Sequence, residues 1–193
     1  IYTQIEEAVD FVLRNIRLGA TIDGLVRKEK YELPPEAIRE MIINAHCHRN
    51  LLDESCIQVA VYDDRLEVTS PGGLYNGLTY EEVMNGHSKI RNKGIANIFS
   101  QMGLVEAWGS GIKRILNAAE EYGLSKPRFQ EFDNMFRVEL FRNSFPMTNE
   151  KENIGEASEK HRRSIGGSVE NRPQRYTAKD YKVTFRRSSI ISS

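Results

Sequence analysis

Residues 35–49 of the chain read PEAIREMIINAHCHR, and this stretch has the pattern of an amphipathic helix. Its apolar residues recur every three or four positions, at Ile38, Met41, Ile42 and Ala45. Polar residues follow one another every fourth position on another face, at Glu36, Glu40, Asn44 and His48. Pro35 suits the first turn of a helix, where its missing N–H costs nothing. We therefore expect a helix that packs on a sheet with one face and presents a carboxylate and an amide to a ligand, although the same pattern fits an ordinary solvated face.

The composition is that of a globular protein with one good core. The chain has 193 residues, of which 39% are hydrophobic and 28% charged, and it carries no apolar run of membrane-spanning length. Two cysteines, Cys47 and Cys56, are too few for a disulfide framework, so the cytoplasm is the expected compartment. Because the sequence begins at Ile1 without a methionine, we expect it to be part of a longer protein.

Charge is unevenly distributed along the chain. Residues 151–193 hold ten Lys or Arg and five Asp or Glu, whereas the rest holds 17 basic and 22 acidic residues. The segment 146–193 therefore reads as a basic, poorly ordered tail or linker, and a DNA-binding arm is an alternative for it. The mildly acidic remainder argues against broad binding of nucleic-acid backbone by the core itself.

The flanking segments predict an α+β fold. Residues 3–17 have helical periodicity, and residues 21–33 read as extended, so residues 1–30 form a lead-in from a preceding domain or complete the sheet. Residues 57–62 and 66–68 alternate around Asp63-Asp64 and predict a hairpin that ends at Ser70-Pro71, which should not continue a ladder. Helices are predicted at 95–102 and 112–122, a capping box at Thr79–Glu82, and a closing hairpin after Pro127.

Two glycine turns strengthen the ligand hypothesis. One is Ser70-Pro71-Gly72-Gly73 at a predicted strand end, where a planar ring could lie close to bare backbone. The other is Gly109-Ser110-Gly111 at a predicted helix start, where backbone N–H groups and the helix dipole favour a phosphate. A carboxylate one helical turn from an amide can hold a water and a magnesium ion beside such phosphates.

Taken in order, these residues resemble the GHKL superfamily of ATPases. The similarity is greatest to its RecG-C-terminal-like, HATPase-type branch in bacterial transcriptional regulators, where an AlbA-like or Schlafen-type domain usually precedes. The resemblance covers Glu32 to Arg142 and is carried by 37–40, 44–45, 48–49, 65–68, 70–74, 91–92 and 109–112. It implies a two-layer α/β sandwich at residues 31–145, with a mixed sheet and helices on one face.

The resemblance also implies roles for individual residues. Glu40 resembles the general base that orients the attacking water, and Asn44 resembles the magnesium ligand. The remaining nucleotide-binding positions that it implies are Ser70, Gly72, Gly73, Gly109, Ser110 and Gly111. Arg91 and Asn92 stand where the family has its lid, and they could either contact phosphate or cap the next helix. Ser70 and Pro71 stand where ATP-binding members usually have an aspartate that accepts a hydrogen bond from the adenine amino group.

The predicted function is binding of Mg-ATP, with at most slow hydrolysis, in a transcriptional regulator. Binding would control dimerisation, or DNA binding by a partner domain, and a homodimer is expected without any membrane association. The alternative is a scaffold for dimerisation or effector sensing that has lost nucleotide binding. A zinc site from His46, Cys47, His48 and Cys56 is the weaker interpretation, because His46 and His48 point to different faces of one helix.

Overall fold

The computed structural model describes residues 1–23, 26–104, 110–143 and 181–185. The helices are α1 (Tyr2–Asn15), α2 (Pro35–His48), α3 (Tyr80–Met84), α4 (Lys93–Gln101) and α5 (Gly111–Glu121). The strands are β1 (Leu18–Asp23), β2 (Val26–Tyr31), β3 (Ile57–Val61), β4 (Arg65–Pro71), β5 (Arg128–Phe132), β6 (Met135–Phe141) and β7 (Tyr181–Phe185). Within these ranges, no helix combines the length and the apolar character that crossing a bilayer requires.

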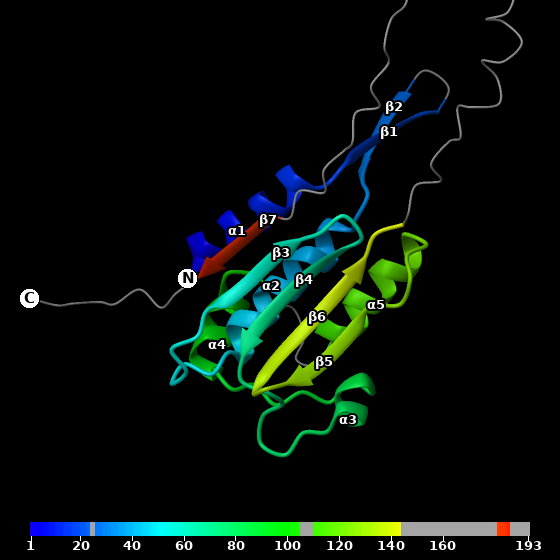
Figure 1. The fold of residues 1–193 in the computed structure, drawn as a ribbon. Coiled ribbons are helices and arrows are strands. Elements are labelled where there is room, and N and C mark those ends of the chain that lie inside the picture. The colour runs from blue at the N-terminus through cyan, green and yellow to red at the C-terminus, as the bar shows by residue number, and fades with distance from the viewer. Residues whose placement is uncertain (24–25, 105–109, 144–180, 186–193) are drawn as a thin grey trace, which may run out of the picture. The chain divides into compact units, whose positions relative to one another are not determined.

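Five strands form the main sheet in the order β5-β6-β4-β3-β7, and helices cover one of its faces (Figure 1). This arrangement confirms the predicted α+β, two-layer fold class. All the described pairs in the sheet are antiparallel, whereas the family resemblance implied a mixed sheet. The pairs β3–β4 and β5–β6 are tight hairpins, which can join only antiparallel neighbours.

The core lies between α2 and the sheet. The apolar stripe of α2 is buried there, with Ile38 and Ile42 fully inaccessible to solvent. Helix α1 packs against α2 and adds Ile5, Ala8 and Val12 to the same apolar cluster. Residues 1–15 of the predicted lead-in thus share the core of the segment that follows them.

Local sequence signals place several boundaries. Thr79 and Glu82 form the predicted capping box at α3, in which each side chain bonds the other residue's backbone N–H. The two-residue turn between β5 and β6 uses Asp133 and Asn134, both with positive φ, as a type I′ hairpin requires. Pro35 stands in the first turn of α2 as predicted.

The prediction that Ser70 and Pro71 would end the ladder is wrong. Both residues belong to β4 and pair with Phe136 and Met135 of β6. The pairing of β4 with β3 stops at Thr69, so Pro71 has a strand neighbour on one side only. Its missing N–H therefore leaves no gap in a second ladder.

A strand also forms within the predicted tail. Residues 181–185 make β7, which pairs with β3 along the edge of the sheet, with Val59 opposite Val183. Residues 144–180 and 186–193 lie outside the described residues, and so does the remainder of the tail prediction.

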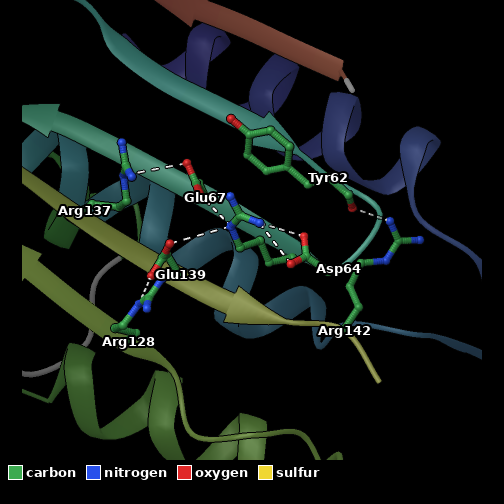
Figure 2. Close-up of polar contacts among 8 residues, drawn as sticks. Tyr62, Asp64, Glu67, Arg128, Arg137, Glu139 and Arg142 are labelled. Carbon is green, nitrogen blue, oxygen red and sulfur yellow. Dashed lines mark hydrogen bonds and ion pairs between the residues drawn. The ribbon is translucent and has the colours of Figure 1, made fainter. Parts of the chain in front are cut away.

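The face of the sheet opposite the core carries a cluster of charged side chains from β4, β5 and β6 (Figure 2). We call it the outer-face cluster, and its members are Arg65, Glu67, Arg128, Arg137 and Glu139. Arg65 Nε lies 2.7 Å from Glu67 Oε1 and 3.6 Å from Glu139 Oε1. Arg128 also pairs with Glu139, and Arg137 Nε lies 3.7 Å from Glu67 Oε2.

Candidate functional site

Helix α2 places Glu40 and Asn44 one turn apart, with their side chains in contact. Asn44 Nδ2 donates a hydrogen bond of 3.1 Å to Glu40 Oε1. The Glu40 side chain is only 7% exposed, so it forms part of a wall rather than a solvated helix surface. The bond fixes the orientation of the Asn44 amide, whose nitrogen points at the carboxylate, and leaves the Oδ1 oxygen as the atom that could bind a cation.

Gly111, the first residue of α5, lies directly against this pair. A Cβ atom added at Gly111 would stand 2.3 Å from Glu40 Oε1 and 2.8 Å from Asn44 Nδ2. Any side chain at position 111 would therefore collide with both functional groups. Glycine lets the start of α5 approach α2 without displacing these side chains, and the approach brings backbone amides of a helix N-terminus next to a carboxylate and an amide.

Arg114, which no sequence pattern marked as a site residue, also contacts Glu40. Arg114 Nη1 lies 3.2 Å from Glu40 Oε2, and its Nε lies 3.7 Å from Glu36 Oε1. Arg114 is three residues beyond Gly111, on the first turn of α5, so its guanidinium reaches across to α2. The two oxygens of Glu40 thus have different partners, with the Asn44 amide on Oε1 and the Arg114 guanidinium on Oε2.

A cavity between α2, the sheet and the start of α5 brings most of the predicted site residues together. Its lining includes Glu40, Asn44, Ser70, Gly72, Gly73 and Gly111. We call the part formed by Glu40, Asn44 and Gly111 the α5 end, and the part formed by His48, Ser70, Gly72 and Gly73 the β4 end. The remaining lining is largely apolar and includes Met41, Val68, Ile115, Phe129 and Phe136.

The glycine turn at the β4 end is held by side chains from two other segments. Gly72 has a φ of +98°, which favours glycine, and Gly73 O accepts a hydrogen bond of 2.8 Å from Arg91 Nη2. Glu131 Oε1 accepts a hydrogen bond of 3.1 Å from Leu74 N and occupies the place that a Cβ of Gly73 would take. The glycines therefore serve the packing of this turn as well as lining the cavity.

Arg91 and Asn92 lie beside the cavity and bond the end of α2. Arg91 Nε donates to His48 O at 2.9 Å, and Asn92 Nδ2 donates to His46 O and Arg49 O at 3.2 and 2.8 Å. Asn92 N also donates to Cys47 O at 3.0 Å. These bonds satisfy carbonyl groups that a helix end leaves without a partner. Neither side chain is among the described residues that line the cavity.

The structure describes only part of the second glycine turn. Gly111 lines the cavity, and Ser110 precedes it as the N-cap residue of α5. The predicted site residue Gly109 lies outside the described residues.

Other lining residues escaped the sequence analysis. His87, Ser88 and Lys89, between α3 and α4, line the cavity, as do the aromatic residues Tyr75, Phe129 and Phe136. The polar, glycine-spaced character of residues 86–94 was the signal for the first group. No local pattern marks Phe129 and Phe136, because their inward position follows from the register of β5 and β6.

Burial governs the titration of the groups at the end of α2. It lowers the pKa of His48 to about 4, with a further contribution from the Arg91 charge, so this imidazole is neutral near pH 7. It raises the pKa of the Cys47 thiol to about 12, which keeps the thiol protonated. Burial also lowers the pKa of His46, whose Nδ1 lies 2.9 Å from Ile42 O.

Metal chemistry at this site would depend on Asn44 and the ligand. In the described part of the chain, no three His, Cys, Asp or Glu side chains gather as a metal-binding group. One amide oxygen fits the way in which Mg²⁺ is usually held, with few protein ligands and the remainder from phosphate oxygens and water.

One comparison with known proteins supports an ATPase-like domain. Residues 54–140 match the family model described as "Putative ATP-dependent DNA helicase recG C-terminal". The matched segment begins after α2, so it includes Ser70, Gly72, Gly73 and Gly111 but not Glu40, Asn44 or His48. None of the curated proteins searched matches the chain.

Among solved structures, the chain is similar to the DIP2311 protein from Corynebacterium diphtheriae. The two share 26% sequence identity with a TM-score of 0.66, over 73% of this chain and 29% of that one. The chain therefore spans under a third of the length of that protein. The family match supports an ATPase-like domain in this chain, and the solved structure shares its fold.

Proposed function

We propose that the cavity binds a nucleotide, Mg-ATP, and hydrolyses it slowly at most. The observation that carries the proposal is the contact of Glu40 and Asn44 with Gly111 at a helix start, in one cavity with the glycine turn of β4. A carboxylate, an amide oxygen and a helix N-terminus are the groups that a magnesium-bound phosphate chain needs. The similarity to a family described as ATP-dependent adds independent support.

Each end of the cavity would contact a different part of the nucleotide. At the α5 end, the backbone at Gly111 and the dipole of α5 would face the phosphates, and Asn44 Oδ1 would bind the metal. When bound, the magnesium ion would supply charge neutralisation to the phosphates. At the β4 end, Ser70 and the bare backbone of Gly72 and Gly73 would hold the base within apolar walls.

The contacts of Glu40 favour binding over hydrolysis. A general base must present a carboxylate oxygen to the attacking water. Here the Asn44 amide holds Oε1 and the Arg114 guanidinium holds Oε2, at 3.1 and 3.2 Å. Water would have to compete with both partners, so turnover should be slow even when nucleotide is bound.

Binding would act as a signal within a larger protein. The chain covers 29% of the DIP2311 protein, which leaves room for partner domains in a protein of that length. We propose that nucleotide controls dimerisation, or DNA binding by such a partner domain, in a transcriptional regulator. Light scattering with and without Mg-ATP, and a DNA gel shift with the full-length protein, would test these two roles.

The test of binding is titration calorimetry with Mg-ATP on three proteins. The wild-type chain should bind, and Gly111→Ala should lose at least about tenfold in affinity, because its methyl group would collide with Glu40 and Asn44. The matched control is Gly94→Ala, a helical glycine whose added Cβ meets nothing within 4 Å. A thermal melt of each variant separates loss of binding from loss of folding. Absence of binding by the folded wild-type chain would exclude the proposal.

The second candidate is a scaffold for dimerisation or effector sensing without nucleotide. The engaged carboxylate of Glu40 and the largely apolar lining of the cavity favour it. In that case the wild-type chain would show no heat with Mg-ATP, yet it would dimerise, and a bulky substitution in the cavity wall such as Ala45→Phe would change the dimerisation.

A further inference from the structure

Two neutral polar side chains line the β4 end of the cavity. Ser70 is 4% exposed and lies on β4 opposite Phe136, and His48 is the last residue of α2. Both belong to the lining. Glu40 is the one carboxylate among the described lining residues, and it precedes His48 by eight helical residues, or about 12 Å along the α2 axis.

Arg91 fixes this end of the cavity in place. Its guanidinium donates to His48 O at 2.9 Å and to Gly73 O at 2.8 Å, and so joins the end of α2 to the turn that follows β4. The same guanidinium lies over the Tyr75 ring, 4.8 Å from its centroid. Because one guanidinium contacts His48 O, Gly73 O and the Tyr75 ring, the spacing between the end of α2 and the glycine turn is fixed without a ligand.

Both side chains can donate as well as accept hydrogen bonds. A serine hydroxyl carries one donor and two acceptor positions, and a neutral imidazole carries one of each. The low pKa of His48 keeps its ring neutral near pH 7. An adenine edge offers an amino donor next to a ring acceptor, whereas a guanine edge offers a keto acceptor next to a ring donor. A hydroxyl can rotate to meet either edge, and an imidazole can change its tautomer.

We propose that the β4 end of the cavity accepts adenine and guanine nucleotides alike, with Ser70 and His48 as the residues that contact the base edge. This inference rests on the proposed nucleotide-binding function and specifies its ligand class as purine nucleotides of either kind. Selection between purines needs a group that only donates or only accepts, because a wrong partner then leaves a buried polar atom unpaired. Neither side chain is such a group.

The experiment compares the Mg²⁺ complexes of ATP and GTP by titration calorimetry on the wild-type chain and two variants. We expect the two dissociation constants of the wild type to agree within about threefold. Ser70→Asp should favour ATP by about tenfold or more, because its carboxylate accepts from the adenine amino group and repels the guanine keto oxygen. Thr69→Asp is the control, since it adds the same charge one residue earlier on the opposite face, where Thr69 bonds Arg137.

The outcomes distinguish this inference from the function on which it rests. Binding of both nucleotides with similar affinity supports it, and a wild type that prefers either nucleotide by tenfold or more overturns it. Absence of binding of either nucleotide removes the proposed function, and the inference with it. If Ser70→Asp does not fold, His48→Phe is the second variant, and it should weaken ATP and GTP by the same factor; weakening of one alone would overturn the proposal.

Discussion

Two clusters in this molecule bury a carboxylate beside an arginine, and they differ in what surrounds the acid. The cavity cluster consists of Glu40, Asn44 and Arg114, between α2 and α5. The outer-face cluster lies on the other side of the sheet (Figure 2), where Glu139 is 2% exposed and pairs with Arg65 and Arg128. Glu40 lines a cavity, whereas the carboxylates of the outer-face cluster are covered by their own arginine partners.

The comparison shows that a buried acid–arginine pair does not by itself mark a functional site. In the outer-face cluster, Arg137 lies over the Phe132 ring and Arg65 over the Tyr62 ring, so the arginines also cover apolar surface. These contacts explain the charges as part of the sheet's own packing. The Glu40 carboxylate, in contrast, lines a cavity together with other polar groups. A ligand could therefore reach it, and this access distinguishes it from the outer-face cluster.

The largest expected effect follows removal of the shared acid of the outer-face cluster. Glu139→Ala leaves Arg65 and Arg128 without their common partner and should lower the free energy of unfolding by about 2 kcal/mol in urea denaturation. Ligand binding in the cavity should not change. Asp64→Ala is the control, because this acid is 67% exposed and its pair with Arg65 should contribute at most about 0.5 kcal/mol. Equal effects of the two substitutions would refute the structural role of Glu139.

Acid pH should affect the two regions in different ranges. Because burial lowers the pKa of His48 to about 4, the unfolded state binds its proton first, and stability should fall as the pH drops from 6.5 towards 4. The slope for this one group is at most about 1.4 kcal/mol per pH unit. The hydrogen bond from Arg128 lowers the pKa of Glu139, so its contribution holds above the ordinary value of 4.5 and is lost at lower pH.

Urea denaturation at several pH values between 7 and 5 measures how the free energy of unfolding depends on pH in each variant. His48→Gln should flatten the dependence of stability on pH in that range, and Glu139→Gln should leave it unchanged. A His48→Gln variant with the wild-type slope would contradict the lowered pKa of this ring.

The smallest expected effect belongs to the arginine of the cavity cluster. Arg114→Met should cost about 1 kcal/mol of unfolding free energy, because water that enters the cavity can solvate the Glu40 carboxylate and Asn44 still donates to it. Thermal and urea denaturation beside Glu139→Ala measures the difference. A loss as large as that of Glu139→Ala would show that Glu40 is as closed to water as the outer-face acids, and the distinction between the clusters would fail.

The sequence was informative wherever structure depends on neighbours along the chain. The 3.6-residue period of α2, the capping box at Thr79 and the Asp133-Asn134 turn are set by local backbone geometry. The spacing of Glu40 and Asn44 is equally local, because positions four apart meet on one face of any helix. Gly72 and Gly111 were also visible in the sequence, because glycine turns at a strand end and at a helix start allow close approach to the backbone.

Only the tertiary structure decided what those groups meet. Arg114 reaches Glu40 across 74 residues of sequence, Glu131 fills the space beside Gly73, and Arg91 bonds the end of α2 rather than lining the cavity. Each of these contacts depends on which elements pack together and in which register, and a local pattern does not encode that choice. Sequence therefore determined helix α2 and the pair Glu40 and Asn44 on one of its faces. Packing determined that Arg114 contacts Glu40, and that His48 and Ser70 line the other end of the cavity.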